Sequence, residues 1–483
     1  MNLQDEGLFK QQCYIGGRWA EADNGAVIDV VNPASQERLG RVPSLSREEV
    51  RAAVDAANTS QPAWRAKTAK ERAVILRRWY ELCMEHQDDL ATILTLEQGK
   101  PLQEARGEIA YGSSFIEWFG EEAKRIYGDV IPAHASDRRI VVTKEPIGVV
   151  AAITPWNFPN AMITRKAAAA MAAGCTVVVK PASSTPYSAL ALAELAARAG
   201  VPQGVFNVVT GSARMVGGEL TDNPIVRKLS FTGSTEVGKV LLGQCANTVK
   251  KVSMELGGNA PFIIFDDADL DQAVAGVMAS KFRNAGQTCV CANRIFVHDK
   301  VYDAFADKLS QAVNALRLGD GLEPDVTIGP LIDEAAVEKV EQHIEDARAR
   351  GATVYLGGMR HARGGTFFMP TILTEVPAES RLMNEETFGP VAPLLRFSDE
   401  AEVIRQANDT EFGLACYFYS RDIGRVWRIA EALEYGIVGI NEGLISSELA
   451  PFGGVKESGI GREGSKYGIE DYIEIKYMCM GGL

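Results

Sequence analysis

The middle of the chain alternates between short apolar runs and longer alanine-rich or amphipathic segments that end at glycine. Thr176–Lys180 contains three consecutive valines, and the alanine-rich segment before it stops at Gly174. Continuous β-branched runs are typical of parallel strands covered on both faces, and a glycine just past a helix supplies its left-handed end. A second alternating block begins after Gly257 and continues to about Ile440. The pattern predicts two doubly wound α/β domains.

Two extended segments do not fit this alternation. Residues 127–148 interrupt a helical region, and the carboxy-terminal segment 469–480 has the composition of a strand. We expect the two segments to pair with each other, outside either α/β domain. At 483 residues the chain is too long for one simple core, so two or three domains are expected.

Composition and charge argue against several classes of function. The chain has 50 Lys and Arg against 63 Asp and Glu, and a net charge of −13 disfavours nucleic acid as a partner. Five histidines and eight cysteines show neither metal-ligand spacing nor a disulfide framework, so no metal is expected. No apolar run reaches the roughly 18–20 residues that span a bilayer, and residues 1–19 contain no apolar targeting segment. We expect no membrane association and a reducing, cytoplasmic environment.

One short loop carries a candidate nucleophile. Cys289 lies in Gly286–Arg294, between two apolar segments, and Glu255 stands upstream beside a pair of glycines. A thiolate is a strong nucleophile and a carboxylate can serve as a general base, although a lone cysteine is more often a buried small hydrophobe. Together with Thr154–Pro159, these segments resemble the aldehyde dehydrogenase superfamily, and the resemblance covers almost the whole chain.

The resemblance implies a role for each catalytic residue. Cys289 would attack an aldehyde carbon, and its backbone N–H and the Asn157 side chain would stabilise the oxyanion. Glu255 would then activate the water that hydrolyses the thioester. Related acylating enzymes, which pass the acyl group to coenzyme A, generally lack this glutamate, so its presence favours hydrolysis. Without the resemblance, Asn157 could equally form an Asx turn before Pro159.

The same resemblance implies a nicotinamide coenzyme. Gly233 and Ser234 follow the strand-like segment 227–231 and begin a predicted helix, whose N-terminal N–H groups suit a phosphate. The resemblance assigns this turn, with Trp156, to the coenzyme pyrophosphate; the alternative is a simple helix cap at Ser234. Glu386 matches the family residue that holds the nicotinamide ribose, and Phe388 matches the ring beside it.

Two neighbouring residues bear on the choice of coenzyme. Lys180 ends a buried strand and is placed to contact the adenosine ribose, and Ser183 follows three residues later. Relatives with glutamate at the position of Ser183 favour NAD, because a carboxylate repels a 2′-phosphate. Serine removes that repulsion, so we expect NADP to be preferred and NAD to remain possible.

Two glycine-rich motifs are excluded by their surroundings. Residues 459–464 match the dinucleotide fingerprint GxGxxG, but no strand precedes them and no βαβ unit surrounds them. Residues 233–239 nearly match a phosphate-binding P-loop, but Val240 stands where a magnesium-binding hydroxyl is required.

Three residues indicate the substrate. Arg165, Arg283 and Ser446 lie in segments that closely resemble superfamily members acting on succinate semialdehyde. Two arginines and a serine in one pocket would bind a carboxylate through charge-assisted hydrogen bonds, whereas surface arginines are usually only solvated. The expected reaction is oxidation of this small carboxylated aldehyde to succinate. The alternatives are glutarate semialdehyde, one methylene longer, and a catalytically silent binding or scaffold protein on the same fold.

The resemblance also implies a division into three parts and association of the chain. The expected parts are a cofactor-binding domain of residues 1–122 and 147–257, a catalytic domain of residues 258–457, and an oligomerisation arm of residues 123–146 and 458–483. A homodimer or homotetramer is expected. Cys291, two residues from the nucleophile, is a candidate partner for a reversible inactivating disulfide under oxidation.

Overall fold

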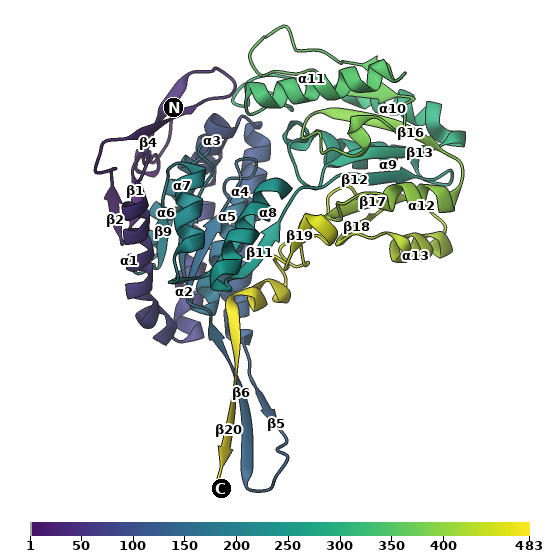
Figure 1. Ribbon diagram of the computed structural model, residues 1–483. Coiled ribbons are helices and arrows are strands. Elements are labelled where there is room, and N and C mark those ends of the chain that lie inside the picture. Colours follow the sequence, from purple (N-terminus) through teal and green to yellow (C-terminus); the bar gives the residue numbers. More distant parts are fainter. Residues whose placement is uncertain (1) are drawn as a thin grey trace.

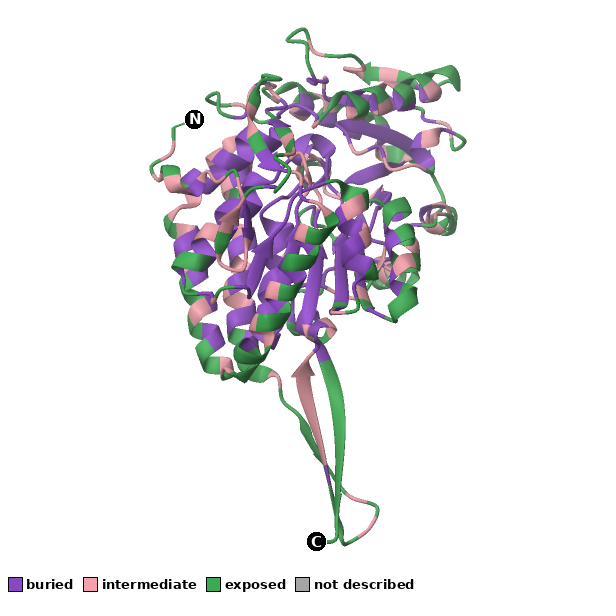
Figure 2. Ribbon diagram, turned by 60° about the vertical axis from the view of Figure 1, so that its left-hand side comes forward, coloured by how far each residue is buried: buried purple, intermediate pink, exposed green. Residues whose placement is uncertain are grey.

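Two helix-covered β-sheets and a narrow arm make up the computed structural model, which describes residues 2–483 (Figure 1). Within these residues, the strands form an eight-stranded sheet, a seven-stranded sheet, a three-stranded arm and a two-stranded ribbon of β3 (Val27–Val31) and β4 (Arg38–Pro43). Buried residues fill both lobes, while exposed residues predominate along the arm (Figure 2). The predicted α/β class with a small β arm is confirmed.

The first sheet has a parallel centre and antiparallel edges. Its parallel strands lie in the order β11-β10-β7-β8-β9, and the edge strands β19, β1 and β2 are antiparallel. The strand bounds are β1 (Cys13–Ile15), β2 (Arg18–Ala20), β7 (Val149–Ile153), β8 (Thr176–Lys180), β9 (Phe206–Val208), β10 (Val226–Thr232), β11 (Lys251–Glu255) and β19 (Gly459–Ile460). Successive strands are added on one side of β7 as far as β9 and then on its other side from β10 onward. Doubly wound sheets bind ligands at such a switch point.

Helices cover both faces of this sheet. Their bounds are α1 (Arg47–Ala66), α2 (Ala69–Glu85), α3 (Gln87–Gln98), α4 (Leu102–Glu122), α5 (Ala161–Ala173), α6 (Tyr187–Arg198), α7 (Ala213–Asp222) and α8 (Thr235–Cys245). The helices α1 and α2 both begin with capping boxes, in which the Ser46 and Thr68 side chains accept from the third helical N–H. All thirteen residues of α5 are buried, and Gly174 ends it at φ +98°, as its sequence predicts.

The second sheet repeats the arrangement. Its order is β14-β15-β16-β13-β12-β17-β18, and β14 is its antiparallel edge. The strand bounds are β12 (Ala260–Ile264), β13 (Ala292–His298), β14 (Thr353–Leu356), β15 (Thr371–Thr374), β16 (Val391–Phe397), β17 (Ala415–Tyr419) and β18 (Ile437–Ile440). The helices are α9 (Leu270–Val277), α10 (Tyr302–Asn314), α11 (Glu334–Ala349), α12 (Glu400–Asn408) and α13 (Ile423–Ala432).

Residues 270–284 do not form one continuous helix. The helix α9 ends at Val277, a π-helical turn covers Met278–Phe282, and a short 3-10 turn follows. Asn284 and Ala285 within that turn have φ +51° and +54°, values that a right-handed helix does not contain. This change of direction brings the chain into the cysteine loop, and π-turns of this kind are frequent at functional sites.

The arm consists of β5 (Asp129–Ile131), β6 (Arg138–Pro146) and β20 (Ile473–Gly481). The strand β20 pairs antiparallel with β6 along its whole length, from Ile473 opposite Pro146 to Gly481 opposite Arg138. The predicted pairing of the carboxy-terminal segment with residues 127–148 is therefore confirmed. The glycine fingerprint at residues 459–464 forms no Rossmann turn, because β19 is a two-residue antiparallel edge strand.

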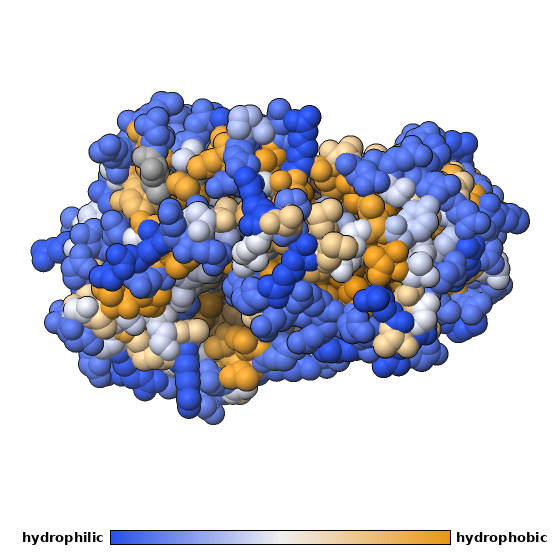
Figure 3. Space-filling model, turned by 90° about the horizontal axis from the view of Figure 1, so that it is seen from above, coloured by the Kyte–Doolittle hydropathy of each residue, from blue (hydrophilic) through white to orange (hydrophobic). Residues whose placement is uncertain are grey.

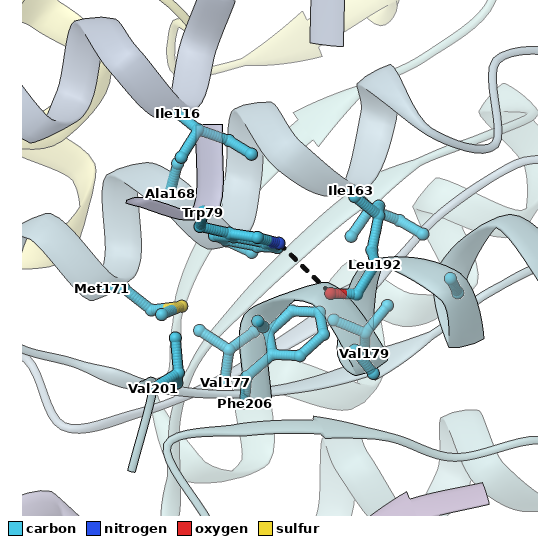
Figure 4. Packing of buried hydrophobic residues seen from close by; sticks show 14 of the residues in the cluster. Trp79, Ile116, Ile163, Ala168, Met171, Val177, Val179, Leu192, Val201 and Phe206 are labelled. Atoms are coloured by element: carbon cyan, nitrogen blue, oxygen red, sulfur yellow. Dashed lines mark hydrogen bonds between the residues drawn. The ribbon is translucent and has the colours of Figure 1, made fainter. Parts of the chain in front are cut away.

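Trp79 of α2 shows how the first sheet and its helices pack. Its indole is fully buried against Phe206 of β9, with ring centroids 5.4 Å apart in an edge-to-face arrangement (Figure 4). Its Nε1 donates to the Leu192 carbonyl of α6 at 3.2 Å. The buried polar end of the indole is thus satisfied, and three elements are locked together at one point.

Candidate active site

A cavity of about 380 Å³ opens where the two lobes meet. Hydrophilic residues cover most of the lobe surfaces when the molecule is viewed from above, and apolar residues reach the surface between them (Figure 3). The cavity is lined by the loops after β7 and β10, the cysteine loop, α11 and the loop before β16. Seven of the predicted site residues line it, namely Trp156, Asn157, Gly233, Ser234, Cys289, Glu386 and Phe388.

The cysteine loop is held by buried side-chain amides. Asn157 Nδ2 donates to the Gln287 carbonyl at 2.9 Å, and Asn284 Nδ2 donates to the same oxygen at 3.2 Å. Gly258 packs so closely that a Cβ there would lie 2.5 Å from the carbonyl oxygen of Cys289. Asn157 follows β7, so the predicted oxyanion donor and the nucleophile loop are joined directly.

The environment of Cys289 favours the protonated thiol. Burial raises the pKa of the thiol to about 12; the negative charge of Glu386 acts in the same direction, and the positive charge of Arg165 opposes both. At neutral pH the resting side chain is therefore a thiol, and additional positive charge in the cavity is needed to favour the thiolate.

Glu255, the last residue of β11, is a buried carboxyl without a partner. Neither side-chain oxygen has a hydrogen-bond partner in residues 2–483. Burial raises its pKa well above the usual carboxyl range, and the neighbouring charge of Glu463 raises it further. A carboxyl with a raised pKa and free oxygens has the properties of a general base that works near neutral pH.

Glu463 is a residue of this region that the sequence did not reveal. Arg165 Nε lies 2.5 Å from its Oε2, and Lys166 forms a second ion pair with its other oxygen. Although burial opposes it, these two cations hold the pKa of Glu463 below its ordinary value. Two adjacent basic residues in the alanine-rich helix α5 could have indicated a buried acidic partner. Nothing in the sequence shows which acidic residue that partner is.

The two predicted substrate arginines keep free donors. Arg165 Nη2 is buried and has no hydrogen-bond partner among the described residues, and within them Arg283 forms no ion pair. Instead, the Arg283 guanidinium lies 5.3 Å from the centre of the Phe158 ring. Burial raises the pKa of the Cys289 thiol, and positive charge from both arginines acts in the opposite direction.

Tyr111 of α4 belongs to the same cluster and was missed by the sequence reading. Burial raises the pKa of its phenol, while Arg165, Arg283 and Ser446 act to lower it. The phenol oxygen is buried and has no hydrogen-bond partner among the described residues. Ser446 lies half-buried in the loop after β18.

The lining of the cavity fits a nicotinamide dinucleotide. Gly233 and Ser234 stand at the start of α8, where Ser234 caps the helix by accepting from Val237 N–H at 3.4 Å. The cap expected as an alternative is therefore present, and the same turn faces the cavity. The rings of Trp156 and Phe388 meet edge to face at 5.5 Å, forming an aromatic wall.

Glu386 offers a half-buried carboxylate for a ribose. It accepts from Gly258 N–H at 3.2 Å, and burial raises its pKa to about 7. Thr232 Oγ1, which is buried in the cavity lining, has no partner among the described residues. A carboxylate and an unpartnered hydroxyl beside an aromatic wall suit the hydroxyls and the ring of such a coenzyme.

Lys180 and Ser183 lie outside this lining, at the carboxyl end of β8 and in the turn after it. Lys180 Nζ donates to the Pro181 carbonyl at 3.0 Å, and burial lowers its pKa to about 8. Lys180 ends the strand next to β7, and Ser183 follows it. Both residues therefore lie at the carboxyl ends of the parallel strands, as Gly233 does.

Cys291 is buried, and its thiol faces away from solvent. Its Sγ lies 3.5 Å from the Lys281 carbonyl oxygen, to which it donates, and both Cys289 and Cys291 are free cysteines. The reversible disulfide between them remains a prediction, and its formation requires the Cys291 side chain to leave this contact.

Residues 2–483 contain neither a metal-site geometry nor a helix suited to a bilayer. Their histidine, cysteine and acidic side chains form no group with the geometry of a metal site. Among the same residues, no helix combines the length and apolar character needed to cross a bilayer.

A model of the aldehyde dehydrogenase family matches residues 19–478. The chain belongs to the aldehyde dehydrogenase family. It is 70% identical over 481 residues to the succinate-semialdehyde dehydrogenase [NADP(+)] GabD of Escherichia coli, with 100% of both chains covered. It is 68% identical over 483 residues to the glutarate-semialdehyde dehydrogenase of Pseudomonas aeruginosa, again with complete coverage of both.

A crystal structure described as an E. coli NADP-dependent enzyme superimposes with a TM-score of 0.99 at 70% identity. The match covers 99% of this chain and 100% of that one. The resemblance to the aldehyde dehydrogenase superfamily is thus confirmed over nearly the whole length of the chain.

The raised pKa of Glu255 predicts a pH dependence for this aldehyde dehydrogenase. A carboxyl accepts a proton only above its pKa, so turnover should rise with pH through a pKa above the ordinary carboxyl range. Glu255→Gln should lose this titration and turn over slowly after a first burst of reduced coenzyme, and Cys289→Ala should produce no burst.

The matched control is Glu345→Gln, at a side chain 72% exposed on α11, which should keep the wild-type profile. Steady-state and stopped-flow absorbance between pH 5 and 9 measure both quantities. Wild-type turnover with an unchanged pH profile in Glu255→Gln would contradict the assignment of the base.

Proposed function

We propose that this chain oxidises succinate semialdehyde to succinate by covalent catalysis at Cys289, with NADP as the preferred coenzyme and NAD as a usable one. The observation that carries the proposal is the pair of cationic side chains near the thiol. Arg165 Nη2 and the Arg283 guanidinium are donors without carboxylate partners among the described residues. An aldehyde with a carboxylate at its far end supplies the missing partner.

The chain supplies the groups that the first chemical steps need. Once the Cys289 thiol has lost its proton, Sγ bonds to the aldehyde carbon, and the carbonyl oxygen becomes an oxyanion. The Asn157 amide, already fixed on the Gln287 carbonyl, has a second N–H with which to stabilise that oxygen. Loss of hydride from the same carbon converts the thiohemiacetal into a thioester on Cys289.

Hydrolysis completes the cycle. Glu255 takes a proton from water, the resulting hydroxide adds to the thioester carbon, and the carbon–sulfur bond breaks to release succinate. Both side-chain oxygens of Glu255 are buried and unpartnered, so either of them can accept that proton. When bound, the oxidised nicotinamide supplies a hydride acceptor and a positive charge; Trp156, Ser234, Glu386 and Phe388 are the residues that would hold it.

The relatives support both the reaction and its closest alternative. The relatives at 70% and 68% identity are named for succinate semialdehyde and glutarate semialdehyde, which differ by one methylene. A pocket separates such homologues by only about 1–3 kcal/mol. The two arginines favour a carboxylated aldehyde of either length over an uncharged one, and we place succinate semialdehyde first.

The wider proposal assigns a role to each part of the fold. The first sheet with its helices binds the coenzyme, the second carries the nucleophile, and the arm joins protomers in a homodimer or homotetramer in the cytoplasm. Several apolar side chains of β20 are exposed on the arm, among them Ile475 and Tyr477. Exposed apolar side chains on a projecting strand favour association.

The two arginines predict a loss of activity that depends on the charge of the substrate. Arg165→Gln or Arg283→Gln should weaken kcat/KM for succinate semialdehyde about 10- to 150-fold, because one charge-assisted hydrogen bond contributes about 1.5–3 kcal/mol. Uncharged butanal should be far less affected. Steady-state kinetics with both aldehydes at saturating coenzyme provide the comparison. Equal losses for the two aldehydes would show that the arginines are structural and would remove the basis of the proposal.

Ser183 predicts the preference for coenzyme. A carboxylate facing the 2′-phosphate costs several kcal/mol in a poorly solvated site, whereas a hydroxyl costs almost nothing. NADP should therefore give the higher kcat/KM in the wild type, and Ser183→Glu should shift the ratio toward NAD by about tenfold or more. Ser184→Glu, one residue further along the same turn, is the matched control and should leave the ratio close to that of the wild type. A wild type that already prefers NAD would contradict the role given to Ser183.

A further inference from the structure

His343 of α11 is fully buried and contacts the loop that carries Glu386 and Phe388. Its Nδ1 lies 3.2 Å from Thr387 Oγ1, and its Nε2 lies 3.2 Å from Glu385 Oε2. One imidazole thus bridges the residues on either side of Glu386. No step of the proposed reaction uses this histidine.

The partners fix the protonation of the ring. The Glu385 carboxylate can only accept, so Nε2 carries the proton and Nδ1 accepts from the Thr387 hydroxyl. Burial lowers the pKa of His343, against the opposing effect of Glu385, while the cations Lys339 and Arg381 act with burial. A neutral ring is what two simultaneous contacts of this kind require.

A second contact holds the same loop to α11. Arg381 makes a two-pronged ion pair with Glu385 at 2.8 and 2.9 Å, and its backbone N–H donates to Asp346 Oδ2 at 2.8 Å. Asp346 lies one turn after His343 on α11. The beginning of the loop is therefore attached to one helix at two successive turns.

The other side of the loop forms part of the proposed coenzyme site. Glu386 and Phe388 line the cavity, and Phe388 has φ +53°, a left-handed conformation that costs a bulky residue energy. Gly389 is wedged between α11 and the cysteine loop: its own Cβ would lie 2.4 Å from Val340, and a Cβ on Gly286 would lie 2.2 Å from its carbonyl oxygen. A strained loop persists only where its surroundings hold it.

We infer that His343 is a positioning residue, which through Glu385 and Thr387 holds Glu386 and Phe388 in place for the nicotinamide half of the coenzyme. The inference rests on the coenzyme site of the proposed function. It assigns no contact between His343 and the coenzyme. The adenosine half, whose 2′-phosphate the proposed function places opposite Ser183, does not depend on this loop.

The test separates the two halves of the coenzyme by binding, without turnover. Titration calorimetry would measure Kd for NADP and for adenosine 2′,5′-bisphosphate, which lacks the nicotinamide half, in the wild type, His343→Leu and Glu385→Ala. His343→Leu loses two hydrogen bonds, and Glu385→Ala loses the contact with His343 and the exposed pair with Arg381. Each variant should weaken NADP binding about three- to tenfold and leave the bisphosphate unchanged. The Glu385 side chain is 42% exposed, so Glu385→Ala provides a folded variant even if His343→Leu is unstable.

Two further variants sharpen the result. His343→Gln retains a donor toward Glu385 and should recover part of the affinity for NADP, whereas His134→Leu, at an exposed histidine of the arm, should change neither ligand. Equal weakening of both ligands, or of neither, in His343→Leu and Glu385→Ala would overturn the inference. A wild type that binds NADP no more tightly than the bisphosphate would instead contradict the proposed coenzyme site itself.

Discussion

The shared carbonyl of Gln287 is the contact on which the active site depends. Asn157, which follows a strand of the first sheet, and Asn284, which precedes the cysteine loop of the second domain, both donate to it. Asn284 also donates to the Asn157 carbonyl at 3.0 Å, and the buried Lys100 ammonium donates to that same oxygen at 2.8 Å. The proposed oxyanion donor and the loop of the proposed nucleophile are therefore fixed by one hydrogen-bond network across the junction of the two domains, which is the preorganisation that covalent catalysis requires.

The buried ion pairs leave polar atoms of Arg165 and Glu255 without hydrogen-bond partners among the described residues. Glu463 takes up the charge of Lys166 and one edge of Arg165, and this leaves the other edge of Arg165 unpartnered. Burial raises the pKa of Glu255, and the same glutamate raises it further by like-charge repulsion. One buried ion-paired acid therefore acts on both the proposed base and the proposed anion-binding cation. Burial raises the pKa of the Cys289 thiol, and Arg283 adds a second positive charge, which acts with that of Arg165 to lower it.

Local sequence patterns predicted the main strands and helices and the fold class. The valine run of β8, the alanine-rich α5 and its left-handed end at Gly174 each follow from a few adjacent residues, and the fold class followed from their alternation. Resemblance to a family located the cavity residues. Neither source could pair Arg165 with Glu463, because the partners lie far apart in the chain and buried acids carry no local signature. His343 and the left-handed turn at Asn284 were missed for the same reason: both depend on what packs against them.

The central claim is that the substrate becomes bonded to Cys289 and leaves as an acid. Its most direct test is acid-quench peptide mass spectrometry of Glu255→Gln after mixing with succinate semialdehyde and NADP. A succinyl thioester on Cys289, absent when coenzyme is omitted and absent from Cys291, is the predicted result. Reduced coenzyme without any acyl adduct, or an adduct on another cysteine, would contradict the account, and no reaction at all would favour a silent protein on this fold.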